Sequence, residues 1–414
     1  MRILFLTQIV PFPPDSGPKI KTWHVLCYLA EQGHDITLAS FVRPDEERFV
    51  PELKRVCAQV HAVPIRRSRL KDVFYMVSSQ ISGRPFLIER DDLSGMRSLV
   101  EGMLDRGGFD YALADQLSMT QFLIPKHGRK QTHGDLLQPP QRIFDAHNAV
   151  WTIVERMRQA TPWFMRPMLQ LEAQRVKRYE AKLVLDFEHT LAVTSIDKKD
   201  LMDAVREVAP GTEQDCAQKI TVIPIAVDTA RLAPVQRQAG STNILTLGTL
   251  HYPPNADGIR WFANEVFPCI IRQLPEATLT ILGKNPPSDF LKMAEDNPGI
   301  ITVTGYVQEL TPYLQQAALM VIPVRAGSGM RVRILEALAL AMPIVTTTVG
   351  LEGIEARNGE EVLVTDTPDD FAAAVIRLMG DGDLQMKLAQ SGRRLAEDTY
   401  DWRVVLKKLD QVIK

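Results

Sequence analysis

The segment at residues 322–340, IPVRAGSGMRVRILEALAL, constrains the fold more than any other part of the chain. An apolar strand at Leu319–Ile322 ends at Pro323, a loop with glycines at positions 327 and 329 follows, and an amphipathic helix comes next. Glycines let a backbone approach a ligand closely, and the exposed N–H groups of a helix start attract anions. The segment therefore predicts an α/β domain with an anion site beyond the carboxyl end of a strand.

Basic residues surround the start of this helix. Arg325, Arg331 and Arg333 bring planar guanidinium groups, which suit phosphate oxygens, and Glu336 follows in the second turn. We interpret the group as a phosphate site. The alternative is an ordinary turn before a solvated basic helix face.

Length and composition narrow the class of protein. At 414 residues the chain is expected to form two domains of about 200 residues each. A net charge of −2 argues against a protein dominated by nucleic-acid binding. No apolar run approaches the roughly 20 residues that span a bilayer, and the start, MRILFLTQIV, is interpreted as a buried strand rather than a signal peptide. The scattered cysteines indicate neither zinc nor disulfides, so we expect a cytoplasmic protein.

Strand-like and helix-like segments alternate in two series, which predicts two doubly wound α/β domains with a cleft between them. The segment Asp228–Thr242, rich in Ala, Gln, Arg and Pro, is the predicted linker. Helices are predicted at Lys21–Gln32 and near Ile259–Leu274. The predicted strands are Ile3–Thr7, Asp35–Phe41, Val60–Ile65, Tyr111–Ala114, Arg142–Asp145, His189–Thr194, Asn243–Leu247, Ala277–Leu282, Ile301–Thr304, Leu319–Ile322 and Pro343–Thr347.

Neither common nucleotide signature is present, because no G-x-x-x-x-G-K-[ST] occurs and no G-x-G-x-x-G follows the first strand. Other short motifs follow one another in a recognisable order. The opening strand leads to PPDSG with Gly17, and the second series opens with LTLGTLHYPPNADGIRWF, which contains Gly248. LTILG then ends at Gly283, and GYVQEL follows at Gly305–Leu310. Together with the loop and helix around Glu336, this order resembles the retaining GT-B-fold glycosyltransferases of family 4, glycosyl transferases group 1, over nearly the whole chain.

The final loop departs from the commonest pattern of that family, which has two glutamates separated by seven residues. Position 328, eight before Glu336, is Ser328. The loop is similar to a subgroup with the pattern P-x-R-x-G-[SG]-G-x-[RK]-x-[RK]-x-L-E. The carboxylate that usually holds the hydroxyls of the sugar is missing here, so the identity of the sugar stays open.

The resemblance implies an N-terminal acceptor-side domain at 1–225, to which a helix at about 400–414 returns, and a nucleotide-sugar-binding domain at 240–398. It also implies transfer of a hexosyl or related sugar from a nucleotide diphosphate sugar to an acceptor hydroxyl, with anomeric retention and without a cofactor. Arg331 and Arg333 are expected to stabilise the leaving group, and Glu336 to bind the ribose hydroxyls. The other residues expected at the donor are Gly17, Gly248, Lys284, Tyr306, Val307, Arg325, Gly327, Ser328, Gly329 and Met330.

His147 directly follows a predicted strand of the first domain, in IFDAHNAVW. The family often has a histidine at such a strand end, so His147 is expected to bind the transferred sugar or orient the acceptor. A structural His–Asp pair with Asp145 is the alternative. The only D-x-D, Asp381–Asp383, lies between two helix-like segments, and we interpret it as a turn and helix cap. We therefore expect no metal, with arginines in the place of a cation.

Two segments bear on the acceptor, which we expect to be a glycan on a lipid carrier. Arg66–Lys71 is a basic cluster followed by FYMV, and Pro162–Leu183 combines aromatic and basic residues. Such stretches suit peripheral docking on the anionic inner face of a membrane. A solvated helix face packed through its apolar residues is an equally good interpretation.

We thus expect a cytoplasmic, metal-independent glycosyltransferase of exported or cell-surface polysaccharide synthesis. Two rivals stay open. One is a nucleotide-sugar epimerase of the same fold, for which we identify no dense acidic and histidine cluster in the sequence. The other is a catalytically weak nucleotide-sugar-binding subunit, which Ser328 in place of glutamate makes plausible.

Overall fold

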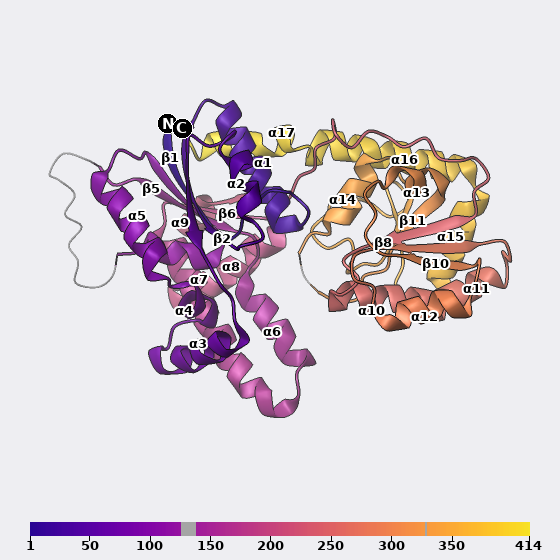
Figure 1. Cartoon of the computed structure of the whole chain (residues 1–414), viewed down its shortest axis with the longest axis horizontal. Helices are drawn as coiled ribbons and strands as arrows, with labels where there is room; N and C mark the ends of the chain where they lie inside the picture. The colour runs from indigo at the N-terminus through magenta and orange to yellow at the C-terminus, as the bar shows by residue number, and fades with distance from the viewer. Residues whose placement is uncertain (126–137, 328) are drawn as a thin grey trace. The chain divides into compact units, whose positions relative to one another are not determined.

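The computed structural model describes residues 1–125, 138–327 and 329–414. The chain divides into two compact units. Unit 1 contains Met1–Ile225 and Leu406–Lys414, and unit 2 contains Ala226–Val405. The boundaries that we expected, 1–225 and 240–398, omit short stretches at both ends of unit 2. Each unit is built on a parallel sheet (Figure 1).

Unit 1 has a sheet of seven strands in the order β3-β2-β1-β4-β5-β6-β7. Every strand pair in it is parallel. β1 is buried from its second residue onward because helices cover both faces of such a sheet, which selects continuous apolar runs. The strands are β1 (Arg2–Thr7), β2 (Asp35–Val42), β3 (Gln59–Pro64), β4 (Tyr111–Asp115), β5 (Gln141–Ala146), β6 (His189–Ala192) and β7 (Ile220–Val222).

The helices of unit 1 follow the local signals of the sequence. Thr194 and Asp197 form a capping box that starts α8. Helices α6 and α7 form a hairpin that projects from the unit (Figure 1). Glu180 of α7 binds the first N–H groups of α6, and burial raises the pKa of its carboxyl to about 8 although those two bonds lower it. The helices are α1 (Gly17–Glu31), α2 (Val50–Leu53), α3 (Arg69–Ser82), α4 (Phe86–Asp91), α5 (Ser94–Arg106), α6 (Val150–Ala160), α7 (Arg166–Asp186), α8 (Ser195–Val208) and α9 (Glu213–Lys219), with short helical turns η1 (Glu47–Phe49), η2 (Leu117–Phe122), η3 (Trp163–Met165) and η6 (Leu406–Gln411).

The last residues of the chain belong to unit 1. The backbone N–H of Lys414 donates to the Tyr111 hydroxyl at 3.0 Å, and the Tyr28 hydroxyl donates to Asp410 at 2.9 Å. These bonds hold the C-terminal segment on α1 and β4, so both chain ends lie in one unit (Figure 1).

Unit 2 has a sheet of six strands in the order β10-β9-β8-β11-β12-β13, and all of its strand pairs are parallel. In its core the Phe371 ring of α15 packs against the Phe262 ring of η4. The strands are β8 (Asn243–Leu247), β9 (Thr278–Leu282), β10 (Ile301–Thr304), β11 (Ala317–Ile322), β12 (Ile344–Thr346) and β13 (Leu363–Val364). The helices are α10 (Pro253–Trp261), η4 (Phe262–Val266), α11 (Phe267–Ile271), α12 (Ser288–Asp296), α13 (Thr311–Gln316), α14 (Val332–Ala339), α15 (Pro368–Gly380), α16 (Gly382–Leu395), η5 (Ala396–Tyr400) and α17 (Trp402–Val405).

The prediction of two doubly wound α/β domains is confirmed, with three local differences. The helix predicted near Ile259–Leu274 is interrupted by the π-helical turn η4, because Pro268 lacks the N–H that would continue the α-helical pattern. The segment predicted as a linker, Asp228–Thr242, is part of unit 2. Its Val235 and Gln238 N–H groups donate to carbonyl oxygens of unit 2. Strands β7 and β13 were not predicted.

Two expectations about smaller features can also be compared with the structure. Asp381 caps α16 by accepting a hydrogen bond from the Leu384 N–H at 2.8 Å, which confirms our interpretation of the D-x-D as a turn and cap. Within the part of the chain that the structure describes, no helix is both long and apolar enough to cross a membrane.

Candidate functional site

A buried polar cluster occupies the carboxyl edge of the unit 1 sheet. Thr7, Asp115 and Asp145 are register partners on the neighbouring strands β1, β4 and β5, and none of their side chains is exposed. His147 follows directly after β5, and its side chain is only 9% exposed. The parallel topology thus places four polar groups together at the edge where ligands bind in such sheets.

Asp115 lies at the centre of this cluster. Its carboxylate accepts hydrogen bonds from the Thr7 hydroxyl at 2.7 Å and the Thr22 hydroxyl at 3.0 Å, and His147 Nε2 lies 2.7 Å from Oδ1. Burial raises the pKa of the Asp115 carboxyl, but His147, Thr7 and Lys21 outweigh this effect and hold the pKa below its ordinary value. Asp115 is therefore a charged acceptor that holds the imidazole in place.

Asp145 forms an ion pair with Lys21 of α1, and both side chains are buried. The His147 imidazole is farther from this carboxylate, with 4.0 Å between Nε2 and Oδ2. The alternative interpretation from the sequence was a His–Asp pair with Asp145, but the closer carboxylate is Asp115. That partner comes from β4, 32 residues earlier in the chain.

Among the described residues, the ligand atoms of Asp115, Asp145 and His147 are close enough together to hold a metal ion, within 4.8 Å of one another. The groups that surround these three side chains are unsuited to a metal ion. The Lys21 ammonium already neutralises Asp145, and two hydroxyl groups and the imidazole surround Asp115. A cation would have to displace a buried lysine, so we interpret the cluster as an ion-pair network.

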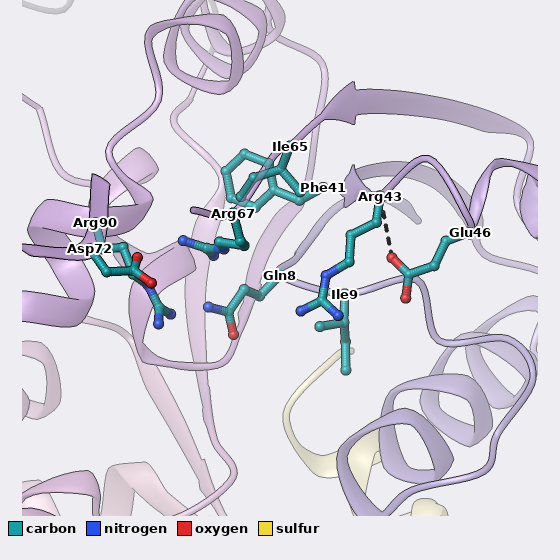
Figure 2. A pocket seen from close by; sticks show the side chains of 9 residues that line it. All are labelled: Gln8, Ile9, Phe41, Arg43, Glu46, Ile65, Arg67, Asp72 and Arg90. Atoms are coloured by element: carbon teal, nitrogen blue, oxygen red, sulfur yellow. Dashed lines mark hydrogen bonds between the residues drawn. The ribbon is translucent and has the colours of Figure 1, made fainter. Parts of the chain in front are cut away.

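A polar cavity of about 240 Å³ lies at the same edge of unit 1, beyond β1 and β2 (Figure 2). A second cavity of about 300 Å³ shares part of its wall and extends along α3. Gln8 and Arg43 line the first cavity and come directly after β1 and β2, so the strand-end rule would have found them in the sequence. The lining residues are Gln8, Ile9, Phe41, Arg43, Glu46, Ile65, Arg67, Asp72 and Arg90.

Guanidinium groups face this cavity (Figure 2). The buried Asp91 carboxylate positions two of them. Asp91 binds Arg67 Nη2 at 2.7 Å and Arg90 Nε at 3.0 Å, and it also accepts from the Gln8 amide. Burial raises the pKa of the Asp91 carboxyl, but Arg90 and Arg67 hold it below its ordinary value. Arg43 has no ion-pair partner in the described part of the chain. The cavity therefore suits a carboxylate or phosphate group.

In unit 2, the loop after β11 has the backbone expected from its glycines. Gly327 and Gly329 have φ of 110° and 83°, which residues with a side chain rarely adopt. Arg331 precedes the first residue of α14 and turns back over the loop, with Nη2 3.4 Å from the Ala326 carbonyl oxygen. A Cβ atom at position 327 would lie 3.0 Å from the same nitrogen. Met330 is buried, and Ser328 lies outside the described residues.

The other two predicted arginines are each paired with an acid. Arg325 forms two hydrogen bonds with Asp257, at 3.1 and 3.0 Å, and lies over the Trp261 ring. Arg333 Nη1 lies 2.6 Å from Glu336 Oε2, one turn along α14. Arg331 is thus the predicted arginine whose side chain lies on the glycine loop. Arg333 and Glu336 form an ion pair with each other.

The remaining predicted residues of unit 2 follow the neighbouring strands. Gly248 comes directly after β8 and donates to the Leu282 carbonyl oxygen at 3.0 Å. Gly283 follows β9, and a Cβ atom there would lie 2.0 Å from the Gly248 carbonyl oxygen, so position 283 requires glycine. Lys284 Nζ lies 4.7 Å from the centre of the exposed Tyr306 ring, a cation–π contact between two predicted donor residues.

Val307 is half-buried beside Tyr306 in the segment that follows β10. Gly17, the last of the predicted donor residues, belongs to unit 1. It is the first residue of α1. Lys21 and Thr22 of the same helix bind Asp145 and Asp115 in the buried cluster. The structure therefore groups the predicted residues into a strand-end site on each unit.

Two doubly wound units with polar and glycine-rich strand ends define a class of two-domain α/β proteins that includes the GT-B glycosyltransferases. Residues 241–381 match the family model "Glycosyl transferases group 1". A relative from Klebsiella pneumoniae, "Uncharacterized 44.6 kDa protein in cps region", is 21% identical over 421 residues, which cover 99% of this chain and 98% of the relative.

Solved structures share the fold over the full length. Anabaena Alr3699/HepE in complex with UDP-glucose has a TM-score of 0.65 and 12% identity, covering 100% of this chain and 99% of that chain. The lipopolysaccharide outer core galactosyltransferase WaaB in its apo form has a TM-score of 0.58 and 14% identity, with coverage of 100% and 99%. The chain thus has the GT-B fold, and its residues 241–381 match the glycosyl transferases group 1 model.

Proposed function

We propose that the chain is a retaining, metal-independent glycosyltransferase that moves a hexosyl or related sugar from a nucleotide diphosphate sugar to an acceptor hydroxyl. The observation that carries the proposal is the glycine loop after β11, with Arg331 turned back over it, inside the segment that matches the family model. A structural neighbour solved with UDP-glucose supports the donor class. The cps region of the relative and the lipopolysaccharide galactosyltransferase support cell-surface polysaccharide synthesis.

The leaving group in this reaction is a nucleoside diphosphate, so catalysis consists mainly of stabilising its developing negative charge. Arg331 and the backbone N–H groups at the start of α14 would supply that stabilisation. Glu336 would bind the ribose hydroxyls, and Arg333, which is 2.6 Å from it, would hold the carboxylate in position. Lys284 and Tyr306 would lie beside the phosphates and the base.

The strand edge of unit 1 would receive the acceptor. His147, fixed by the charged Asp115, would contact the transferred sugar or the acceptor hydroxyl. The cavity lined by Arg43, Arg67 and Arg90 would bind an anionic group of the acceptor, such as the phosphate of a lipid-linked glycan.

The activity is tested with a labelled donor. A thermal-shift screen of UDP, GDP, ADP and TDP sugars first identifies the donor. Transfer of label to an acceptor is then expected both in EDTA and without it, because the described residues offer arginines at the phosphate site and the D-x-D is a helix cap. Loss of transfer in EDTA that Mg²⁺ or Mn²⁺ restores would show that the mechanism requires a metal. The anomeric configuration of the product, read by NMR, tests retention.

The same assay separates the rival functions. A catalytically weak binding subunit would shift in the thermal screen without forming product. An epimerase would release an altered sugar in the absence of any acceptor. At the strand edge of unit 1 the His147 imidazole lies 2.7 Å from Asp115 and 4.0 Å from Asp145, and the Asp115 carboxylate is already committed to three donors.

Glu336→Gln is expected to weaken binding of the free nucleoside diphosphate by about 1.5–3 kcal/mol, the contribution of a hydrogen bond to a charged group. The amide keeps the size of the side chain but accepts from the ribose hydroxyls without charge. Calorimetry measures the affinity, and Glu295→Gln, at an exposed position of α12, is the matched control. Equal affinity of Glu336→Gln and the parent would rule out the ribose role.

A further inference from the structure

Helix α3 of unit 1 turns its apolar side toward solvent. Leu70, Val73, Phe74, Val77 and Ile81 recur at helical spacing and therefore form one stripe along the helix. Their exposed fractions are 84%, 55%, 68%, 55% and 85%. An amphipathic helix of a globular protein normally buries such a stripe, so this orientation indicates an interaction surface.

The orientation of α3 is fixed by its polar side. The Ser79 hydroxyl donates to the Arg84 carbonyl oxygen at 2.7 Å, and the Ser78 hydroxyl donates to Glu89 at 2.6 Å. Tyr75 lines the cavity of about 300 Å³ beside the helix. Arg175 of α7 donates to the Ser79 carbonyl oxygen at 3.2 Å. The helix therefore cannot roll its apolar stripe inward without breaking these bonds.

A second group of exposed apolar side chains lies at the end of the neighbouring α6–α7 hairpin. Trp163 and Phe164 are 79% and 65% exposed and pack edge to face, with ring centres 6.2 Å apart. The Arg175 bonds link α7 to α3, and Figure 1 shows α3 and the tip of the hairpin at the same end of unit 1. Trp is typical of the boundary between lipid headgroups and acyl chains.

Positive charge flanks the apolar stripe. Arg69 and Lys71 lie on either side of Leu70 on α3, and Arg66 precedes the helix. All three are exposed, and within the described ranges none of them has an ion-pair partner. Asp72, the acidic residue of α3, lines the cavity beside the helix together with Arg66 and Lys71. This charge is local, because the whole chain has a net charge of −2.

We propose that the α3 stripe and the Trp163–Met165 tip dock unit 1 on an anionic lipid surface. The apolar side chains enter the boundary between headgroups and acyl chains, and the flanking cations bind lipid phosphates. Lys71, Asp72 and Tyr75 of the same helix form one wall of the cavity, so docking brings this cavity to the level of the headgroups. The docking itself is independent of the proposed function. Only the idea that the cavity at the headgroups receives a lipid-linked acceptor rests on that function.

Cosedimentation of the full chain with vesicles tests the docking. Binding is expected to vesicles that combine phosphatidylcholine and phosphatidylglycerol and to be much weaker to phosphatidylcholine alone. Phe74→Gln/Ile81→Gln removes two exposed apolar side chains and should reduce the partition coefficient by about tenfold for each. Met386→Gln, at an exposed apolar position of α16 in unit 2, is the matched control and should bind as the parent does.

The electrostatic part has its own variant. Arg66→Gln/Arg69→Gln should reduce binding to the anionic vesicles about fivefold for each charge and leave the weak binding to neutral vesicles unchanged. Parent protein that does not sediment with anionic vesicles, or Phe74→Gln/Ile81→Gln that sediments equally, overturns the proposal. A dimer in light scattering that the same double variant converts to a monomer would assign the stripe to a second copy of the chain. None of these measurements depends on sugar transfer.

Discussion

Replacing Arg331 with alanine is expected to lower turnover by about 10²–10³-fold, the usual loss when one donor to a developing charge is removed. Of the three arginines near the glycine loop, Arg331 is the one whose guanidinium lies on the loop itself, 3.4 Å from the Ala326 carbonyl oxygen, and Arg325 and Arg333 bind Asp257 and Glu336. A donor diphosphate bound at this loop would meet Arg331 first. Single-turnover transfer under saturating donor measures the effect.

Two further variants make the Arg331 result specific. Arg377→Ala removes an exposed arginine from α15 of the same unit and should turn over as the parent does. Arg331→Lys keeps the charge but loses the planar fork, so an intermediate rate is expected. Turnover of Arg331→Ala within threefold of the parent, with an unchanged melting temperature, would exclude this residue from the phosphate site.

His147→Ala is expected to slow sugar transfer at least about 10²-fold, at the lower end of positioned acid–base effects. His147 belongs to unit 1, whereas the proposed nucleotide contacts belong to unit 2. Free nucleoside diphosphate should therefore bind the variant almost as tightly as it binds the parent. An interaction made mainly in the reacting state lowers kcat and kcat/KM together.

A structural role for His147 makes a different prediction. The imidazole lies 2.7 Å from the buried Asp115, so its loss removes one of the partners that keep this carboxylate charged. If that were its only role, the melting temperature would fall by several degrees and the rate per folded molecule would stay near that of the parent. His147→Gln retains an N–H donor, and His61→Ala removes a half-buried histidine elsewhere in unit 1 as the control.

Most of the strands could be predicted from the sequence. β8 and β10 begin and end where they were predicted, at Asn243–Leu247 and Ile301–Thr304. The central residues of β8 are buried, because a strand covered on both faces favours apolar side chains. β7 and β13 have only three and two residues. Segments that short carry no periodicity, and they are strands because they pair with β6 and β12.

The candidate site was predictable only in part. Glycines and arginines after strands mark the carboxyl edges of both sheets, so His147 and Arg331 could be identified from local order. Their partners could not. Asp115 contacts His147 from β4, 32 residues earlier in the chain, and Lys21 of α1 pairs with Asp145 across a separation of 124 residues. Asp257 reaches Arg325 from α10.

The sequence by itself determined the alternation of strands and helices and the strand-end position of the glycine loop, because both depend on side-chain chemistry within a few neighbouring residues. Only the tertiary structure decided which charged side chains form ion pairs and which surfaces remain exposed to solvent. The sequence of α3 specifies an apolar stripe, but not which way this stripe faces. That orientation depends on hydrogen bonds of the opposite side of the helix, which Ser79 makes with Arg84 and Arg175. Such contacts join residues distant in the chain, and no local pattern encodes them.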